Sequence, residues 1–158
     1  MPTPLPAPTP DLCNCLAIRK AARHVTQFYD QRLAPTGLTT PQFSILARLR
    51  RRGPSTINDL AEDLVMDRTT LGRNLRPLER DGLLAIGADP DDRRRRALAV
   101  TPEGEARLAQ AGPLWAAAQR DFADSFGAEA AVALRTSLAA LVATDLNGPP
   151  LNASPLAT

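Results

Sequence analysis

Residues that bind metal ions or form disulfides are scarce in this sequence. Its 158 residues include one histidine, His24, and two cysteines, Cys13 and Cys15. Since a structural zinc site takes four such ligands, the sequence predicts no metal site and no cofactor. Catalytic carboxylate pairs and phosphate-binding loops are also missing, which argues against an enzyme. A thiol enzyme, with His24 as its base, is the one alternative of that kind that stays open.

Long apolar runs are missing as well. No segment approaches the roughly 20 apolar residues of a membrane-spanning helix. The first ten residues are rich in proline and uncharged, unlike a signal peptide. We therefore expect a cytoplasmic protein without a membrane partner, in which the cysteines form no permanent disulfide. Composition predicts disordered tails at residues 1–10 and 146–158.

The formal net charge is only +2, so the distribution of charge is more informative than its sum. Residues 67–96 hold eight arginines and six acidic residues, whereas residues 97–158 hold three basic and six acidic residues. A surface that faces phosphates, separate from another surface, would produce this pattern. The alternative is that the charges lie on ordinary solvated helix faces.

Apolar residues at helical spacing predict four helices in the first half of the chain, over residues 11–33, 40–52, 56–64 and 67–81. Thr40, which precedes a proline, is expected to cap the second helix, and Thr56 and Asp67 the third and fourth. Pro77 removes an amide donor inside the fourth helix and is expected to bend it.

Two short apolar runs, 83–86 and 97–100, flank the segment GADPDDRRRR and predict two strands joined by a charged loop. The predicted fold is therefore mainly α with a small β-wing, a winged helix-turn-helix over residues 38–101. Long helices flank it at 11–35 and 102–145. We expect their apolar stripes to pack against a second copy in a symmetric dimer; the alternative is that they pack only on their own domain.

The fourth helix is the predicted recognition helix, because this architecture inserts it into the major groove of DNA. Arginine pairs with guanine, asparagine with adenine, and a threonine methyl group can touch thymine. The candidate DNA contacts on this helix are Arg68, Thr69, Thr70, Arg73, Asn74 and Arg76. The alternative is that these side chains are merely solvated.

Four segments in order carry a resemblance to a known family: LTTPQFSILARL, STINDLAEDL, MDRTTLGRNLRPLERDGLL and DPDDRRRRALAVTPEGEA. Over residues 11–145 the chain resembles the MarR family of bacterial transcription regulators. The resemblance implies a homodimer that binds a palindromic operator in double-stranded DNA and is released by a small-molecule effector. We expect such binding to repress a promoter, with activation as the alternative.

The resemblance also assigns roles in the wing. Asp92 and Arg94 match the family's Asp-x-Arg pattern, in which the carboxylate steadies the loop and the arginine enters the minor groove. The neighbouring arginines are expected to reach phosphates or to pair with Asp89 and Asp91; they are Arg93, Arg95 and Arg96. Four consecutive arginines leave this register ambiguous by one residue.

One branch of the family senses organic hydroperoxides through a cysteine early in the first helix. Cys15 matches that cysteine, and Tyr29 matches a tyrosine that hydrogen-bonds it. Arg19 and Thr40 stand where that branch has tyrosines, which is a departure. Arg19, one turn along, would favour the thiolate, and Cys13 could act as a resolving thiol. The alternative is a small buried apolar cysteine.

Other relatives release DNA when they bind aromatic carboxylates. By this resemblance, a small aromatic or phenolic ligand would meet polar groups of the first helix, namely Arg19, Arg23, His24 and Tyr29. The remaining alternative from another class is a winged helix used as a protein-interaction module. Such a module would show apolar residues where this chain has arginines.

Overall fold

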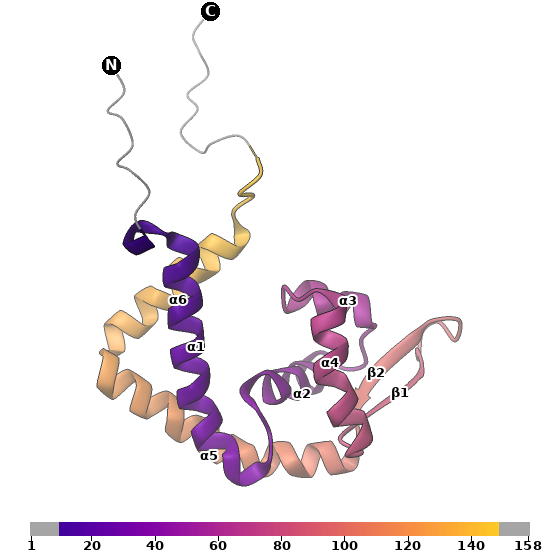
Figure 1. Ribbon diagram of the computed structural model, residues 1–158. Helices are drawn as coiled ribbons and strands as arrows, with labels where there is room; N and C mark the ends of the chain where they lie inside the picture. The colour runs from indigo at the N-terminus through magenta and orange to yellow at the C-terminus, as the bar shows by residue number, and fades with distance from the viewer. Residues whose placement is uncertain (1–9, 149–158) are drawn as a thin grey trace, which may run out of the picture. The chain divides into compact units, whose positions relative to one another are not determined.

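The structure is a computed structural model that describes residues 10–148 (Figure 1). The chain forms two compact units that divide after Ala118. The elements are a 3-10 turn (Pro10–Leu12), α1 (Asn14–Leu33), a second 3-10 turn (Ala34–Thr36), α2 (Thr40–Arg52), α3 (Ile57–Asp63), α4 (Arg68–Arg80), β1 (Leu84–Ala88), β2 (Arg96–Val100), α5 (Pro102–Phe126) and α6 (Ala128–Ala143). The predicted helical fold with a β-wing is confirmed. Most of the two predicted tails lies outside the described residues.

Side-chain caps fix where the helices of the first unit begin. The prediction that Thr40 caps α2 is wrong, because Thr39 does so in a capping box with Gln42. Thr40 is occupied elsewhere, since its amide and its hydroxyl each donate to Asp30 Oδ1 at 2.6 Å. This pair of bonds ties the start of α2 to α1. The caps predicted for α3 and α4, Thr56 and Asp67, are confirmed.

One hydrophobic core holds the first unit together. Its fully buried large side chains come from every helix of the unit except α3 and from both sides of the wing: Leu33, Ile45, Leu46, Leu49, Leu71, Leu78, Leu83, Leu98 and Leu108. Burying one such side chain contributes about 1.5–3 kcal/mol. The inner face of α4 is therefore fixed, and its outer face has a defined orientation.

The wing is a two-stranded antiparallel sheet whose register runs from Leu84 opposite Val100 to Ala88 opposite Arg96. Ser55, in the connection from α2 to α3, also bridges to Leu98. The two residues exchange backbone hydrogen bonds of 3.1 and 2.8 Å. The base of the wing is thus joined to the start of the helix-turn-helix.

The second unit contains the end of α5, a break at Gly127 with φ 98°, and α6. Ala131 is buried, but most large apolar side chains of this unit are exposed: Phe126, Val132, Leu134, Leu138, Leu141, Val142 and Leu146. Within residues 10–148, no single helix has the length and apolar character needed to cross a membrane; α5 and α6 pass that test only when counted together across their break.

Candidate nucleic-acid interface

The start of α4 is held by its capping aspartate. Asp67 accepts hydrogen bonds from the amide of Thr70 at 2.9 Å and from its hydroxyl at 2.5 Å. These bonds lower the pKa of Asp67 below its ordinary value, and the bond from the Thr70 hydroxyl has the largest effect. The first turn of α4 is consequently well ordered, and in a winged helix-turn-helix this turn enters the major groove.

The inner face of α4 is fixed by Leu71, Leu75 and Leu78, which are buried. Five predicted contact residues lie exposed on this helix, namely Arg68, Thr69, Thr70, Arg73 and Arg76, and the sixth, Asn74, is partly buried. The hydroxyl of Thr70 serves the cap. The amide nitrogen of Asn74 donates to the Thr70 carbonyl at 3.0 Å, which leaves the Asn74 carbonyl oxygen as an acceptor. The helix continues past Pro77 to Arg80 without a break.

The loop of the wing, residues 89–95, is shaped by its aspartates. Asp92 Oδ1 accepts the amide of Arg94 at 3.0 Å, and Asp89 Oδ1 accepts the amide of Asp91 at 2.9 Å. Two backbone bonds close the turn, from the Arg95 amide to the Asp92 carbonyl and from the Asp89 amide to the Arg95 carbonyl, each 2.9 Å. Asp92 therefore has the geometry to steady the loop, the role that the family resemblance implies for it.

Several arginines of the described residues have an acidic partner within 4.0 Å, among them Arg48, Arg50, Arg52, Arg80, Arg95 and Arg107. Those on the outer face of α4 and on the wing form no ion pair with any described residue: Arg68, Arg73, Arg76, Arg93, Arg94 and Arg96. Arginines without an acidic partner among the described residues therefore lie on both elements that a winged helix presents to DNA.

A carboxylate that the sequence did not single out joins α2 to α3. Asp63 is bound by the guanidinium groups of Arg48 and Arg52, the latter at 2.8 Å, and its side chain is 14% exposed. The hydrogen bonds from Arg48, and then the two positive charges, lower the pKa of Asp63. In the turn before α4, Val65 has a φ of 51° and is 72% exposed. A β-branched side chain is strained in this left-handed region.

The residues predicted to sense an effector lie on α1. Four are exposed, namely Cys15, Arg19, Arg23 and His24, whereas Tyr29 is buried. Cys13 caps the helix, and its sulfur accepts the amide of Leu16 at 3.4 Å. At 1.5 Å per residue, Cys15 and Tyr29 are separated by about 21 Å along this helix. One copy of the chain therefore does not bring them into contact.

Metal binding is not indicated by the geometry. In residues 10–148, no group of three or more histidine, cysteine, aspartate or glutamate side chains is placed to hold a metal ion. Chemically, the arrangement offers uncompensated guanidinium groups and exposed hydroxyl and amide groups. These are the side chains that bind phosphates and base edges.

Comparison with known proteins agrees with this chemistry. A sequence model of the MarR family matches residues 38–95. The transcriptional regulator HosA of Escherichia coli O111:H- is 31% identical over 113 residues, which are 68% of this chain and 84% of HosA. The transcriptional repressor NicR of Pseudomonas putida is 32% identical over 91 residues, 58% of each chain; the match thus spans a little more than half of NicR.

A solved structure is similar in both fold and sequence. The transcriptional regulator MosR of Mycobacterium tuberculosis, in complex with DNA, has a TM-score of 0.72 and is 40% identical, covering 82% of this chain and 92% of MosR. This similarity extends beyond the winged helix, since it includes residues well outside the 38–95 match.

Proposed function

This chain belongs to the MarR family of DNA-binding transcriptional regulators, which are not enzymes, and from that membership we propose that it binds a palindromic operator as a homodimer and represses transcription. The observation that carries the proposal is the set of unpaired arginines on α4 and the wing. In this proposal α4 reads the major groove, where Arg68 and Arg73 pair with guanines. Arg94 enters the minor groove beside it, where narrow A/T tracts attract arginine.

Dimer formation is supported by apolar side chains that a single copy leaves exposed. On α1 and the turn before it these are Leu12, Leu16 and Ile18, at 62%, 38% and 42% exposure. On α6, Val132, Leu138 and Val142 are exposed in the same way. Such faces are costly in water and are ordinarily covered by a partner. A two-fold dimer would place the two α4 helices about 34–36 Å apart, one turn of DNA, and so read an inverted repeat.

The test is fluorescence anisotropy with a labelled duplex that the wild-type protein selects from a randomised library. We expect tight binding with a steep loss of affinity as salt rises, because phosphate contacts release counterions. Replacing Arg73 by alanine is expected to cost about 1–3 kcal/mol of discrimination between the selected duplex and a scrambled one. The matched control is Arg80→Ala on the same helix, because Arg80 is paired with Asp81 at 2.8 Å. If Arg73→Ala binds as the wild type does, this docking of α4 is wrong.

Repression would follow from occupying a promoter, the activity that the name of NicR gives to that relative. Release would follow from a small aromatic or phenolic ligand bound near α1, where Arg19, Arg23 and His24 offer exposed polar groups. Titrating aromatic carboxylates into the protein–DNA complex tests this step. Dissociation that Arg23→Ala weakens would support the assignment, and indifference to every such compound would contradict it.

A second candidate for the switch is oxidation of Cys15, because Cys13 and Cys15 are both exposed at the start of α1. The Cys15 thiolate would attack an organic hydroperoxide, break its O–O bond, release the alcohol and become a sulfenic acid. Cys13 would then displace water to form a disulfide. Loss of DNA binding on addition of a hydroperoxide, reversed by a reductant and absent from Cys15→Ser, would support this switch. Binding that peroxide leaves unchanged would contradict this switch.

A further inference from the structure

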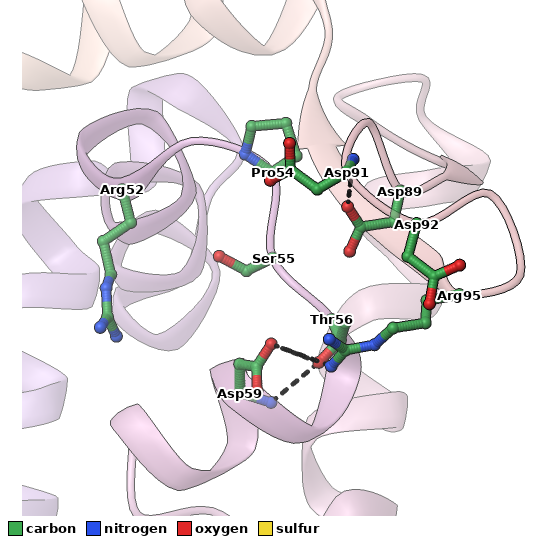
Figure 2. A pocket seen from close by; sticks show the side chains of 9 residues that line it. All are labelled: Arg52, Pro54, Ser55, Thr56, Asp59, Asp89, Asp91, Asp92 and Arg95. Carbon is green, nitrogen blue, oxygen red and sulfur yellow. Dashed lines mark hydrogen bonds and ion pairs between the residues drawn. The ribbon is translucent and has the colours of Figure 1, made fainter.

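A polar pocket of about 320 Å³ lies between the loop of the wing and the start of α3 (Figure 2). Its walls come from the end of α2, the connection to α3, the first turn of α3 and the wing loop. The lining residues are Arg52, Pro54, Ser55, Thr56, Asp59, Asp89, Asp91, Asp92 and Arg95. The pocket therefore separates the wing loop from the body of the helix-turn-helix, and side chains have to bridge it if the loop is to be held.

One of the four consecutive arginines of the wing bridges this pocket. Figure 2 shows the Arg95 side chain extending from the loop toward Thr56 and Asp59. Its Nη2 lies 3.7 Å from Asp59 Oδ2. Within the described part of the chain, Arg93, Arg94 and Arg96 have no acidic partner at this range. The two backbone bonds of Arg95 in the turn, to Asp92 and Asp89, set the direction in which its side chain leaves the loop.

Asp59 is itself fixed in place by the cap of α3. The hydroxyl of Thr56 donates to Asp59 Oδ2 at 2.6 Å, and the amide of Asp59 donates back to the Thr56 hydroxyl at 3.2 Å. The Thr56 hydroxyl, followed by the charge of Arg95, lowers the pKa of Asp59, so this carboxylate is charged at neutral pH. The carboxylate that meets Arg95 thus occupies a defined position on α3.

We propose that Asp59 and Arg95 are a pair of positioning residues for DNA binding, whose contact across the pocket holds the wing loop against the start of α3. The strand pairing that orders the wing ends at Ala88 and Arg96. Beyond it the hydrogen bonds of the turn give the loop its shape, and the contact with Asp59 joins the loop to α3. With the loop held, Arg93 and Arg94 keep a constant orientation relative to α4. In this assignment Arg95 supports the wing through Asp59, whereas the sequence suggests that it contacts phosphate or pairs with Asp89 and Asp91. The inference rests on the proposed function.

Two substitutions that each remove a negative charge from α3 test the proposal, because they should change the affinity for DNA differently. Asp59→Asn removes a negative charge near DNA, and electrostatics alone would make binding tighter. Positioning predicts the reverse, a loss of about two- to five-fold in affinity, the size expected for an exposed ion pair. The matched control is Glu62→Gln, an exposed carboxylate on the same helix with no ion pair in the described residues. This control is expected to bind as well as the wild type or more tightly.

The dependence of affinity on salt distinguishes a support from a phosphate contact. Each lost phosphate contact reduces the slope of log K against log salt by about 0.9. We expect Arg94→Gln to reduce this slope, and Arg95→Gln to weaken binding as much as Asp59→Asn does without changing it. The double variant should be no weaker than either single variant. The reversed pair Asp59→Arg with Arg95→Asp should bind more tightly than either reversal alone.

A slope that falls in Arg95→Gln as it does in Arg94→Gln, together with tighter binding by Asp59→Asn, would overturn the proposal. Amide hydrogen exchange in the free protein tests the same contact without DNA. Asp59→Asn and Arg95→Gln should speed exchange at residues 93–96, whereas Glu62→Gln should not. If the wild type binds no duplex, the proposed function fails. Unchanged exchange in the Asp59→Asn variant would by itself contradict the positioning contact.

Discussion

Replacing Gly104 by alanine should distort the joint between α5 and the wing. Gly104 lies in the first turn of α5 and is buried. A Cβ added there would lie 2.7 Å from Val100 Cγ1 and closer still to the backbone carbonyl oxygen of Leu83. Side chains can turn away from such an overlap, but this carbonyl cannot, because it also accepts the amide of Thr101 at 3.2 Å. The helix or the strand has to move.

The size of the effect follows from the overlap. Overpacking of a well-packed site costs about 1–3 kcal/mol and sometimes more, and a backbone clash on two sides favours the upper end, about 3 kcal/mol. For a chain of this length each kcal/mol lowers Tm by about 2–4 °C. We therefore expect Gly104→Ala to lower Tm by about 6–12 °C, measured by calorimetry at one fixed protein concentration. Fixed concentration matters because a dimer couples stability to concentration.

The same helix provides the control. Gly112 is also in α5, but an added Cβ there would meet no atom within 4 Å. Gly112→Ala should therefore stabilise the protein by about 0.5–1 kcal/mol, since glycine is unfavourable inside a helix. Opposite changes in Tm for the two variants are the expected result. Shifts in the same direction, or a Gly104→Ala variant as stable as the wild type, would refute the close approach of α5 to Leu83.

Three further changes test the scaffold of the interface by chemical denaturation. Asp63→Asn should lower the free energy of unfolding by about 1–3 kcal/mol at pH 7, because it weakens the bonds from Arg48 and Arg52. Since the pKa of Asp63 is lowered in the folded state, this difference should be present above the unfolded pKa of about 3.9 and should vanish as pH falls through the folded value. Val65→Asn should stabilise by about 1 kcal/mol, because asparagine tolerates the left-handed φ. Thr39→Ala should lower the free energy of unfolding by about 1 kcal/mol through loss of the α2 cap. An unchanged denaturation midpoint would contradict Thr39 as the cap and favour Thr40.

The features of the fold that depend on residues close together in the sequence could be predicted from it. The buried face of α4 follows from leucines at helical spacing, and the caps at Thr56 and Asp67 follow from hydroxyl or carboxylate groups placed before apolar runs. Thr40 shows the limit of this reasoning. Both Thr39 and Thr40 can cap a helix. Thr39 does so here because Thr40 is hydrogen-bonded to the carboxylate of Asp30, which lies on another helix.

The candidate site also has features that could be predicted from the sequence and features that could not. The concentration of arginines on α4 and the wing predicts a surface that faces DNA. It cannot predict which of four adjacent arginines turns back to the protein. That choice depends on the hydrogen bonds of the wing loop and on where the cap of α3 holds Asp59. Replacing Arg94 therefore tests a contact with DNA, whereas replacing Arg95 tests the support of the loop, and the salt dependence of binding distinguishes the two.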